Sequence, residues 1–260
     1  MSATVEQWCR DFVGTTEMAA KLTPPDTDGL VFETDAPELR LAAPGRPPEL
    51  RVVERSPSAP RAGPRLLHTF VHHELQAAEL FAWAILAFPR TPLAFRAGLL
   101  ALCREELAHL QLYLGHMRAL GTEFGAHPVR DWFWARVARC ESPAAFLALQ
   151  GLGLEGANLD HCPRFAAQLR AAGDEAGAQI LERVQRDEIG HVAFAAHWFE
   201  HFSGAPLDYG RWRAALPAPL TPALMQGRPL ALAARRKAGM GEEFLAQLAA
   251  EPAIDPRRRA

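Results

Sequence analysis

Disulfide frameworks and thiolate zinc sites find little support in this sequence. The chain has 260 residues and four cysteines, and no two cysteines form a Cys-x-x-Cys pair. The four are Cys9, Cys103, Cys140 and Cys162. We therefore expect reduced, mostly buried thiols in a protein of a reducing compartment.

Membrane signals are also scarce. The longest unbroken apolar run, Leu80–Phe88, is about half the length that a bilayer crossing needs. Residues 1–8 lack the basic and apolar regions of a signal peptide. The net charge of −2 gives no reason to expect nucleic acid or an anionic membrane as partner. These absences favour a cytoplasmic protein with no membrane partner.

Strand signals are nearly absent, and proline divides the chain into three parts. Nine of the 21 prolines fall between Pro24 and Pro64, and seven lie from Pro206 onward. We expect a regular helical core between two irregular arms. The predicted parts are an N-terminal helix with a proline-rich arm over 1–64, the helical core over 65–203, and a C-terminal extension over 204–260.

Capping residues divide the core into four long helices. Pro64 can begin the first helix, Gly121 ends the second, and Ser142 with Pro143 suits the start of the third. The predicted helices cover about 64–88, 92–120, 143–172 and 174–202. Pro163 should kink or restart the third, because it removes a helical hydrogen bond. We also expect a helix around 5–22 and a short one in the long crossover 122–141. The prediction is an all-α fold, a four-helix bundle of two hairpins.

One seven-residue pattern occurs twice. Residues 104–110 read REELAHL and residues 186–192 read RDEIGHV, so two Glu-x-x-His motifs lie 82 residues apart. Each motif falls on a helical stripe with spacings of 4, 3, 4, 3 and 4 residues, which places its Glu and His towards the core. The stripes are Leu102, Glu106, His109, Tyr113, His116, Leu120 and Val184, Glu188, His191, Ala195, Trp198, Phe202.

The repeat extends to the preceding helices. Glu74 and Glu155 are 81 residues apart, as are Glu79 and Asp160. Each half is thus a hairpin with a Glu on its first helix and Glu-x-x-His on its second. Random placement gives roughly 0.8 Glu-x-x-His in such a chain, so one copy is uninformative, but two copies with matching flanks are specific. We interpret each copy as half of a dinuclear metal site.

The ligand set indicates the metal. The predicted ligands are Glu74, Glu106, His109, Glu155, Glu188 and His191. Four carboxylates and two imidazoles supply oxygen and nitrogen donors, which suit octahedral iron or manganese better than structural zinc. Four negative charges also balance two divalent cations. We expect two iron ions, or a manganese and an iron ion.

Over about 65–203 the sequence resembles the ferritin-like di-iron carboxylate superfamily. The stretches HHELQAAELFAWAILAFP and LEGANLD look most like an uncharacterised family of bacterial ferritin-like proteins, a domain of unknown function. A more distant similarity is to the tRNA methylthio-isopentenyladenosine hydroxylases. The resemblance implies the same six ligands. It also implies that Glu105 and Asp187 hydrogen-bond ligand histidines, although Glu105 stands where Asp is usual. Glu79 is the alternative to Glu74, which the helical register favours.

Other residues have simpler interpretations. His72 and His73 suit packing or support of a ligand, and Tyr113 suits core packing, with a redox or hydrogen-bonding role as the alternative. Cys162 is expected to be an inert buried thiol, and His197 and His201 to face solvent. The arginines at 46, 51, 55, 61 and 65, and those at 257–259, are interpreted as a solvated linker and a tail, so nucleic acid is not an expected partner.

Three functions compete on these observations. The first is an O₂-dependent di-iron oxidoreductase that acts on a small or partly apolar organic substrate and takes electrons from an unidentified donor. The second is a ferroxidase or iron-handling protein. The third is a helical interaction module with a vestigial metal site, which the intact ligand set disfavours. We expect a monomer or small homo-oligomer, since no feature points to a storage cage.

Overall fold

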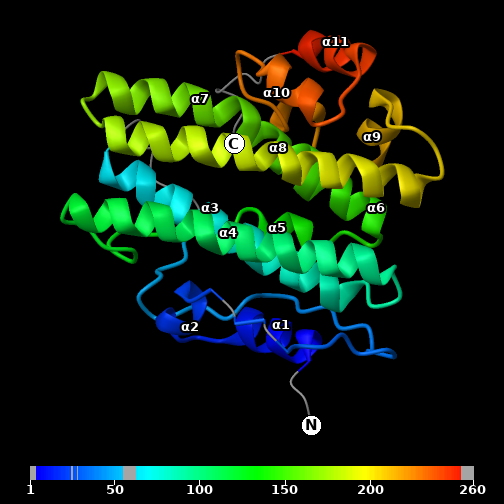
Figure 1. Cartoon of the computed structure of the whole chain (residues 1–260), viewed down its shortest axis with the longest axis horizontal. Helices are drawn as coiled ribbons and strands as arrows, with labels where there is room; N and C mark the ends of the chain where they lie inside the picture. The colour runs from blue at the N-terminus through cyan, green and yellow to red at the C-terminus, as the bar shows by residue number, and fades with distance from the viewer. Residues whose placement is uncertain (1–3, 25, 28, 55–62, 253–260) are drawn as a thin grey trace. The chain divides into compact units, whose positions relative to one another are not determined.

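The computed structural model describes residues 4–24, 26–27, 29–54 and 63–252, and these are helical (Figure 1). Extended pairing in this part of the chain is limited to two isolated bridges, Thr4 with Val31 and Val52 with Val129. The expected all-α class is confirmed. The chain forms two compact units. Unit 1 comprises residues 1–139 and 168–180, and unit 2 comprises residues 140–167 and 181–260.

The central element of unit 1 is a helical hairpin. Helix α3 (Pro64–Ala87) and helix α4 (Leu93–Ala119) lie side by side (Figure 1). Pro64 begins α3 as predicted, and Gly121, with φ of 71°, follows the end of α4. From residue 74 to residue 89, α3 and its C-cap are buried on all sides. This continuous burial explains why the stretch has no polar face in the sequence.

The N-terminal segment forms two helices rather than the single expected one. Helix α1 (Val5–Gly14) is N-capped by Thr4, whose side chain accepts a hydrogen bond from the Gln7 amide, and α1 packs on α3. Helix α2 (Met18–Leu22) follows after a break. Thr15 causes the break, because its extended backbone ends α1 and its hydroxyl accepts a hydrogen bond from the Glu17 amide.

The proline-rich arm of unit 1 is held by backbone carbonyls. Trp83 Nε1 donates to Leu41 O, and Trp134 Nε1 donates to Ala42 O, both at 3.2 Å. At Gly45 an added Cβ would lie 2.2 Å from Gly14 O, so this contact requires glycine. Trp134 begins helix α5 (Trp134–Val137), the short helix expected in the crossover. The arm has no helix in its described part, as predicted.

Unit 2 contains the third predicted helix in three segments. Ser142 caps helix α6 (Pro143–Phe146) as predicted, a π-helix (Leu147–Glu155) follows, and helix α7 (Gly156–Ala171) completes the run. An added Cβ at Gly151 would lie 2.3 Å from the Ala195 Cβ of helix α8 (Glu175–Ser203). An added Cβ at Gly153 would lie 2.7 Å from Met225 Sδ. Both glycines therefore let neighbouring elements approach the π-helix closely.

The expected restart of the helix at Pro163 is wrong. Helix α7 continues through Pro163, and the irregular geometry lies in the preceding π-helix instead. Proline cannot donate to the carbonyl four residues earlier, which is that of Leu159. Gln185 on α8 replaces this donor, because its Nε2 donates to Leu159 O at 2.8 Å. The lost helical bond is thus made by a side chain.

The C-terminal extension is more regular than the proline content suggested. It contains helices α9 (Tyr209–Ala215), α10 (Leu232–Lys237) and α11 (Glu242–Ala250) and a 3₁₀ turn (Pro222–Leu224). Tyr209, Trp212 and Phe244 form an aromatic cluster with centroid distances of 5.2–5.7 Å. Trp212 Nε1 also donates to Ala148 O at 2.9 Å. The expectation of an irregular arm fails here because aromatic burial compensates for the prolines.

Cysteine and membrane expectations can also be compared with the structure. All four cysteines are buried and unbridged, as predicted. Burial, with smaller contributions from neighbouring groups, raises the pKa values of the Cys9 and Cys103 thiols. No helix in the described part of the chain has the length and apolarity that a bilayer crossing needs.

His68 on α3 holds the crossover and predicts a pH dependence of stability. Its Nε2 accepts from the Gly125 amide at 3.0 Å, so the imidazole is neutral, and burial together with His127 and His72 lowers its pKa from 6.5 to about 4. Protons bind the unfolded chain more readily between these values. We therefore expect unfolding free energy to fall as pH drops from about 6.5 towards about 4.

Chemical denaturation at several pH values measures this fall. The His68→Gln variant should show a shallower fall, because glutamine can accept the same bond without titrating. His161, whose pKa burial and Arg164 also lower to about 4, should supply the remainder. A His68→Gln variant with the full wild-type pH dependence would show that His68 does not contribute.

Candidate metal centre

Unit 1 contains the first half of the repeated pattern as a compact group. Glu74 comes from α3, and Glu106 and His109 come from α4, with exposed fractions of 4%, 0% and 2%. His109 Nδ1 lies 3.6 Å from Glu106 Oε2 and 3.9 Å from Glu74 Oε2. Each residue offers a ligand atom within 4.8 Å of those of the other two. These three predicted ligands are therefore placed together.

Unit 2 contains the second half. Glu155 ends the π-helix, while Glu188 and His191 lie on α8, and all three are buried. His191 Nδ1 is 3.1 Å from Glu188 Oε2. Two amides donate to the carboxylates: Asn158 Nδ2 to Glu188 Oε1 at 3.2 Å, and Gln150 Nε2 to Glu155 Oε1.

Helical geometry explains why both motifs face inward and why the predicted stripes fail at their ends. Residues three apart share a face, so Glu106 and His109 are adjacent. Spacings of 4 and 3 average 3.5 residues, whereas a straight helix has 3.6, so the stripe rotates away from the core with each repeat. Leu120 is accordingly exposed, and Trp198 and Phe202 are half-buried. Met117 and Phe199, each one residue off the stripe, are buried in their place.

The residues present suit a bound cation. Buried carboxylates are costly unless a positive charge or hydrogen bonds compensate them. Glu188 Oε2 is fully buried and accepts no hydrogen bond from the described residues, and the nearest basic atom is Nδ1 of the adjacent His191. Carboxylate oxygens beside imidazole nitrogens are donors that divalent transition metals accept. The second half-site therefore offers an acceptor atom that a metal ion would satisfy.

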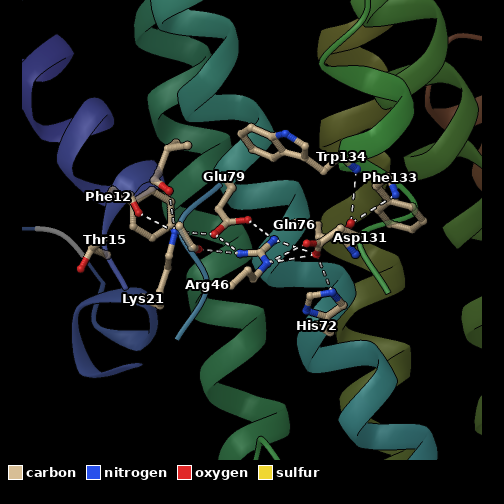
Figure 2. Close-up of polar contacts among 12 residues, drawn as sticks. Phe12, Thr15, Lys21, Arg46, His72, Gln76, Glu79, Asp131, Phe133 and Trp134 are labelled. Atoms are coloured by element: carbon tan, nitrogen blue, oxygen red, sulfur yellow. Dashed lines mark hydrogen bonds and ion pairs between the residues drawn. The ribbon is translucent and has the colours of Figure 1, made fainter. Parts of the chain in front are cut away.

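Glu79, the alternative to Glu74, is engaged elsewhere. Its Oε1 accepts from Lys21 Nζ and from Arg46 Nη1, each at 2.6 Å, and its Oε2 accepts from Arg46 Nη2 at 2.8 Å (Figure 2). Lys21 also donates to Phe12 O and Val13 O at 2.8 Å. Two cations thus hold the Glu79 carboxylate and link α1, α2 and the arm to α3. The geometry favours Glu74 as the ligand, which stays a prediction.

Arg46 connects Glu79 to a second carboxylate. Its Nε donates to both oxygens of Asp131, at 3.0 and 3.1 Å, and His72 Nε2 lies 3.1 Å from Asp131 Oδ1 (Figure 2). Burial would raise the pKa of Asp131, but the His72 and Arg46 contacts outweigh it and lower the pKa to about 2. The interpretation of Arg46 as part of a solvated linker is wrong, because its side chain is 10% exposed.

Asp160, the repeat counterpart of Glu79, has an equivalent partner in unit 2. Arg235 donates through Nε and Nη2 to its two oxygens, at 3.1 and 2.6 Å. The amides of Gly227 and Ala231 also donate to Asp160, at 2.9 and 2.7 Å. The same repeat position thus carries a buried acid in each half, and each acid binds an arginine from the flanking arm or extension.

The remaining candidates occupy varied positions. Glu105 is exposed, and Asp187 is half-exposed with Oδ2 3.8 Å from Arg183 Nε, so support of ligand histidines by either stays a prediction. Tyr113 is buried with its ring 5.6 Å from Phe70. His73 lies 4.7 Å from the Phe133 ring. Three expectations agree with the structure: Cys162 is buried, and His197 and His201 are exposed.

Sequence analysis missed the polar partners of these acids. They are Lys21, Asp131, Gln150, Asn158 and Arg235. No motif marks them, because each acts through one contact made in the folded chain. The repeat did hold a signal, since the matched positions Glu79 and Asp160 suggested a shared role outside the ligand set.

Comparisons with known proteins agree with an uncharacterised family. The family model described as "Protein of unknown function (DUF455)" matches residues 6–246. A protein of Haemophilus influenzae described as "Uncharacterized protein" is 31% identical over 145 residues. That match covers 53% of this chain and 50% of the relative, so the chain spans about half the length of the curated relative. No solved structure matches significantly. Because the family model covers nearly the whole chain, the chain belongs to the DUF455 family of proteins of unknown function.

Proposed function

We propose that the two half-sites together hold two metal ions and that the protein is a non-haem di-iron oxidoreductase, with a manganese–iron pair as the alternative. The observation that carries this proposal is the repeated half-site. Glu74, Glu106 and His109 are buried together in unit 1, and the matching Glu155, Glu188 and His191 are buried in unit 2. Buried acid and histidine in the same pattern twice suits a dinuclear ligand set.

The fold that goes with this function is a ferritin-like four-helix bundle. Helices α3 and α4 would form one hairpin, and the run from α6 to α7 would form the other with α8. Support comes from the helix order, from the 81- and 82-residue repeat, and from the long crossover that contains α5. In such bundles facing helices supply inward Glu and Glu-x-x-His ligands.

The chain's own residues would hold and shield the ions. Carboxylates at positions 74, 106, 155 and 188 would neutralise two divalent cations, while His109 and His191 supply neutral nitrogen donors. A bound ferrous pair supplies two electrons for the reduction of O₂. The apolar stretch from Phe81 to Phe88, which is buried, would keep water from the interior of α3. These features support a small or partly apolar organic substrate.

Oxygen uptake tests the proposed chemistry. We expect the anaerobically iron-loaded, reduced protein to consume about one O₂ per metal pair. The Glu106→Ala variant should lose this uptake. If many iron equivalents per chain are instead oxidised and retained as mineral, the protein is a ferroxidase. If no metal binds, the helical interaction module takes the place of both.

A further inference from the structure

The two half-sites differ in the side chains next to their carboxylates. In unit 2, Gln150 donates to Glu155, and Asn158 donates to Glu188. The positions 81 residues earlier are Thr69 and Ala77. Alanine has no side-chain donor, and the Thr69 hydroxyl donates to Arg65 O at 3.1 Å. The amide donors therefore belong to the second half of the repeat alone at these positions.

The Gln150 amide is directed at Glu155 at a cost to folding. Gln150 is fully buried, and its Oε1 has no hydrogen-bond partner among the described residues. A buried polar atom without a partner destabilises the fold. A methionine of similar shape would avoid this cost. The printed contact of the Gln150 side chain is its donation to Glu155, which lies five residues later in the same π-helix.

We propose that Gln150 and Asn158 are positioning residues that orient Glu155 and Glu188 as metal ligands, so that the second half-site binds its ion more tightly than the first. The proposal rests on the proposed function, since it assumes that both halves bind metal. A hydrogen bond to a carboxylate restricts its rotation and fixes which oxygen faces the metal. Loss of such a supporting residue typically weakens metal affinity by about 10- to 100-fold.

Cobalt(II) titration against a competing chelator tests this difference. Visible absorption follows each of the two binding steps in wild type, Gln150→Met and Thr69→Val. We expect Gln150→Met to weaken the tighter step by about 10-fold or more and to leave the weaker step within about twofold. Thr69→Val is the matched control at the equivalent position of the first half, and both of its steps should stay at wild-type affinity.

The thermal midpoint of the metal-free protein separates this role from a structural one. It should not fall in Gln150→Met, because the substitution removes an unsatisfied buried oxygen. If Gln150→Met does not fold, Asn158→Ala provides the same test on Glu188. Two unchanged steps, or two steps weakened equally, would overturn the positioning role while leaving the metal site intact. Absence of cobalt binding by the wild type would instead overturn the proposed function itself.

Discussion

Replacement of Arg46 by methionine is expected to lower the free energy of unfolding by about 3 kcal/mol. Arg46 donates to both oxygens of Glu79 and to both oxygens of Asp131, and the Glu79 side chain is fully buried. Methionine fills similar space but leaves two carboxylates without this partner. Lys21 remains on Glu79, so the expected loss lies at the lower end for a broken buried pair. Urea denaturation of the metal-free protein measures it.

A surface pair of the same chemistry is the control for Arg46. Arg236 donates to Glu242 through two nitrogens, at 2.5 and 3.0 Å, but both side chains are about half-exposed or more. Water and salt screen such a pair, so Arg236→Met should leave stability at the wild-type value. Similar stability of Arg46→Met and wild type would contradict the buried arrangement of Lys21, Arg46, Glu79 and Asp131.

Substitution of a predicted ligand should abolish stabilisation by metal. A ligand that binds only the folded chain stabilises it by about 4 kcal/mol at a concentration 1,000 times its dissociation constant. Metal should therefore raise the wild-type thermal midpoint, because it neutralises carboxylates buried in the fold. We expect Glu188→Ala to lose the rise, since Glu188 is fully buried beside His191. Differential scanning calorimetry with and without ferrous iron measures the effect.

Glu200 on the same helix is the matched control. It is exposed, and it accepts a hydrogen bond from the Leu207 amide at 2.7 Å. Glu200→Ala removes a carboxylate from α8 without touching the predicted ligands, so its metal-dependent rise should equal that of wild type. If Glu188→Ala keeps the full rise, Glu188 is not a ligand.

Local signals made most of the helical elements predictable. Pro64, Ser142 and Gly121 act within one turn of a helix end, and the structure begins and ends helices beside them. The failures arose from contacts between elements. Gln185 supplies the bond that Pro163 cannot make, and the aromatic cluster around Trp212 stabilises helices in the extension. Such compensation depends on which residues meet after folding, which one sequence does not display.

The candidate site divides in the same way. Repetition exposed the six predicted ligands, because the Glu and His positions recur at fixed spacing on inward stripes. The π-helix carrying Glu155 was not predicted, since its cause lies in the close approach of Ala195 to Gly151. The arginine partners of Glu79 and Asp160 come from segments 33 and 75 residues away. Ion-pair partners at such separations carry no periodic signal.

The most direct test of the dinuclear site is the metal content of the chain. The wild-type protein, loaded anaerobically with ferrous iron and freed of excess metal, is measured by elemental analysis beside Glu106→Ala. We expect about two iron ions per chain in the wild type, held roughly 3–4 Å apart by X-ray absorption, and fewer in the variant. Metal content at background level, or a single zinc ion per chain that Glu106→Ala retains, would contradict the account.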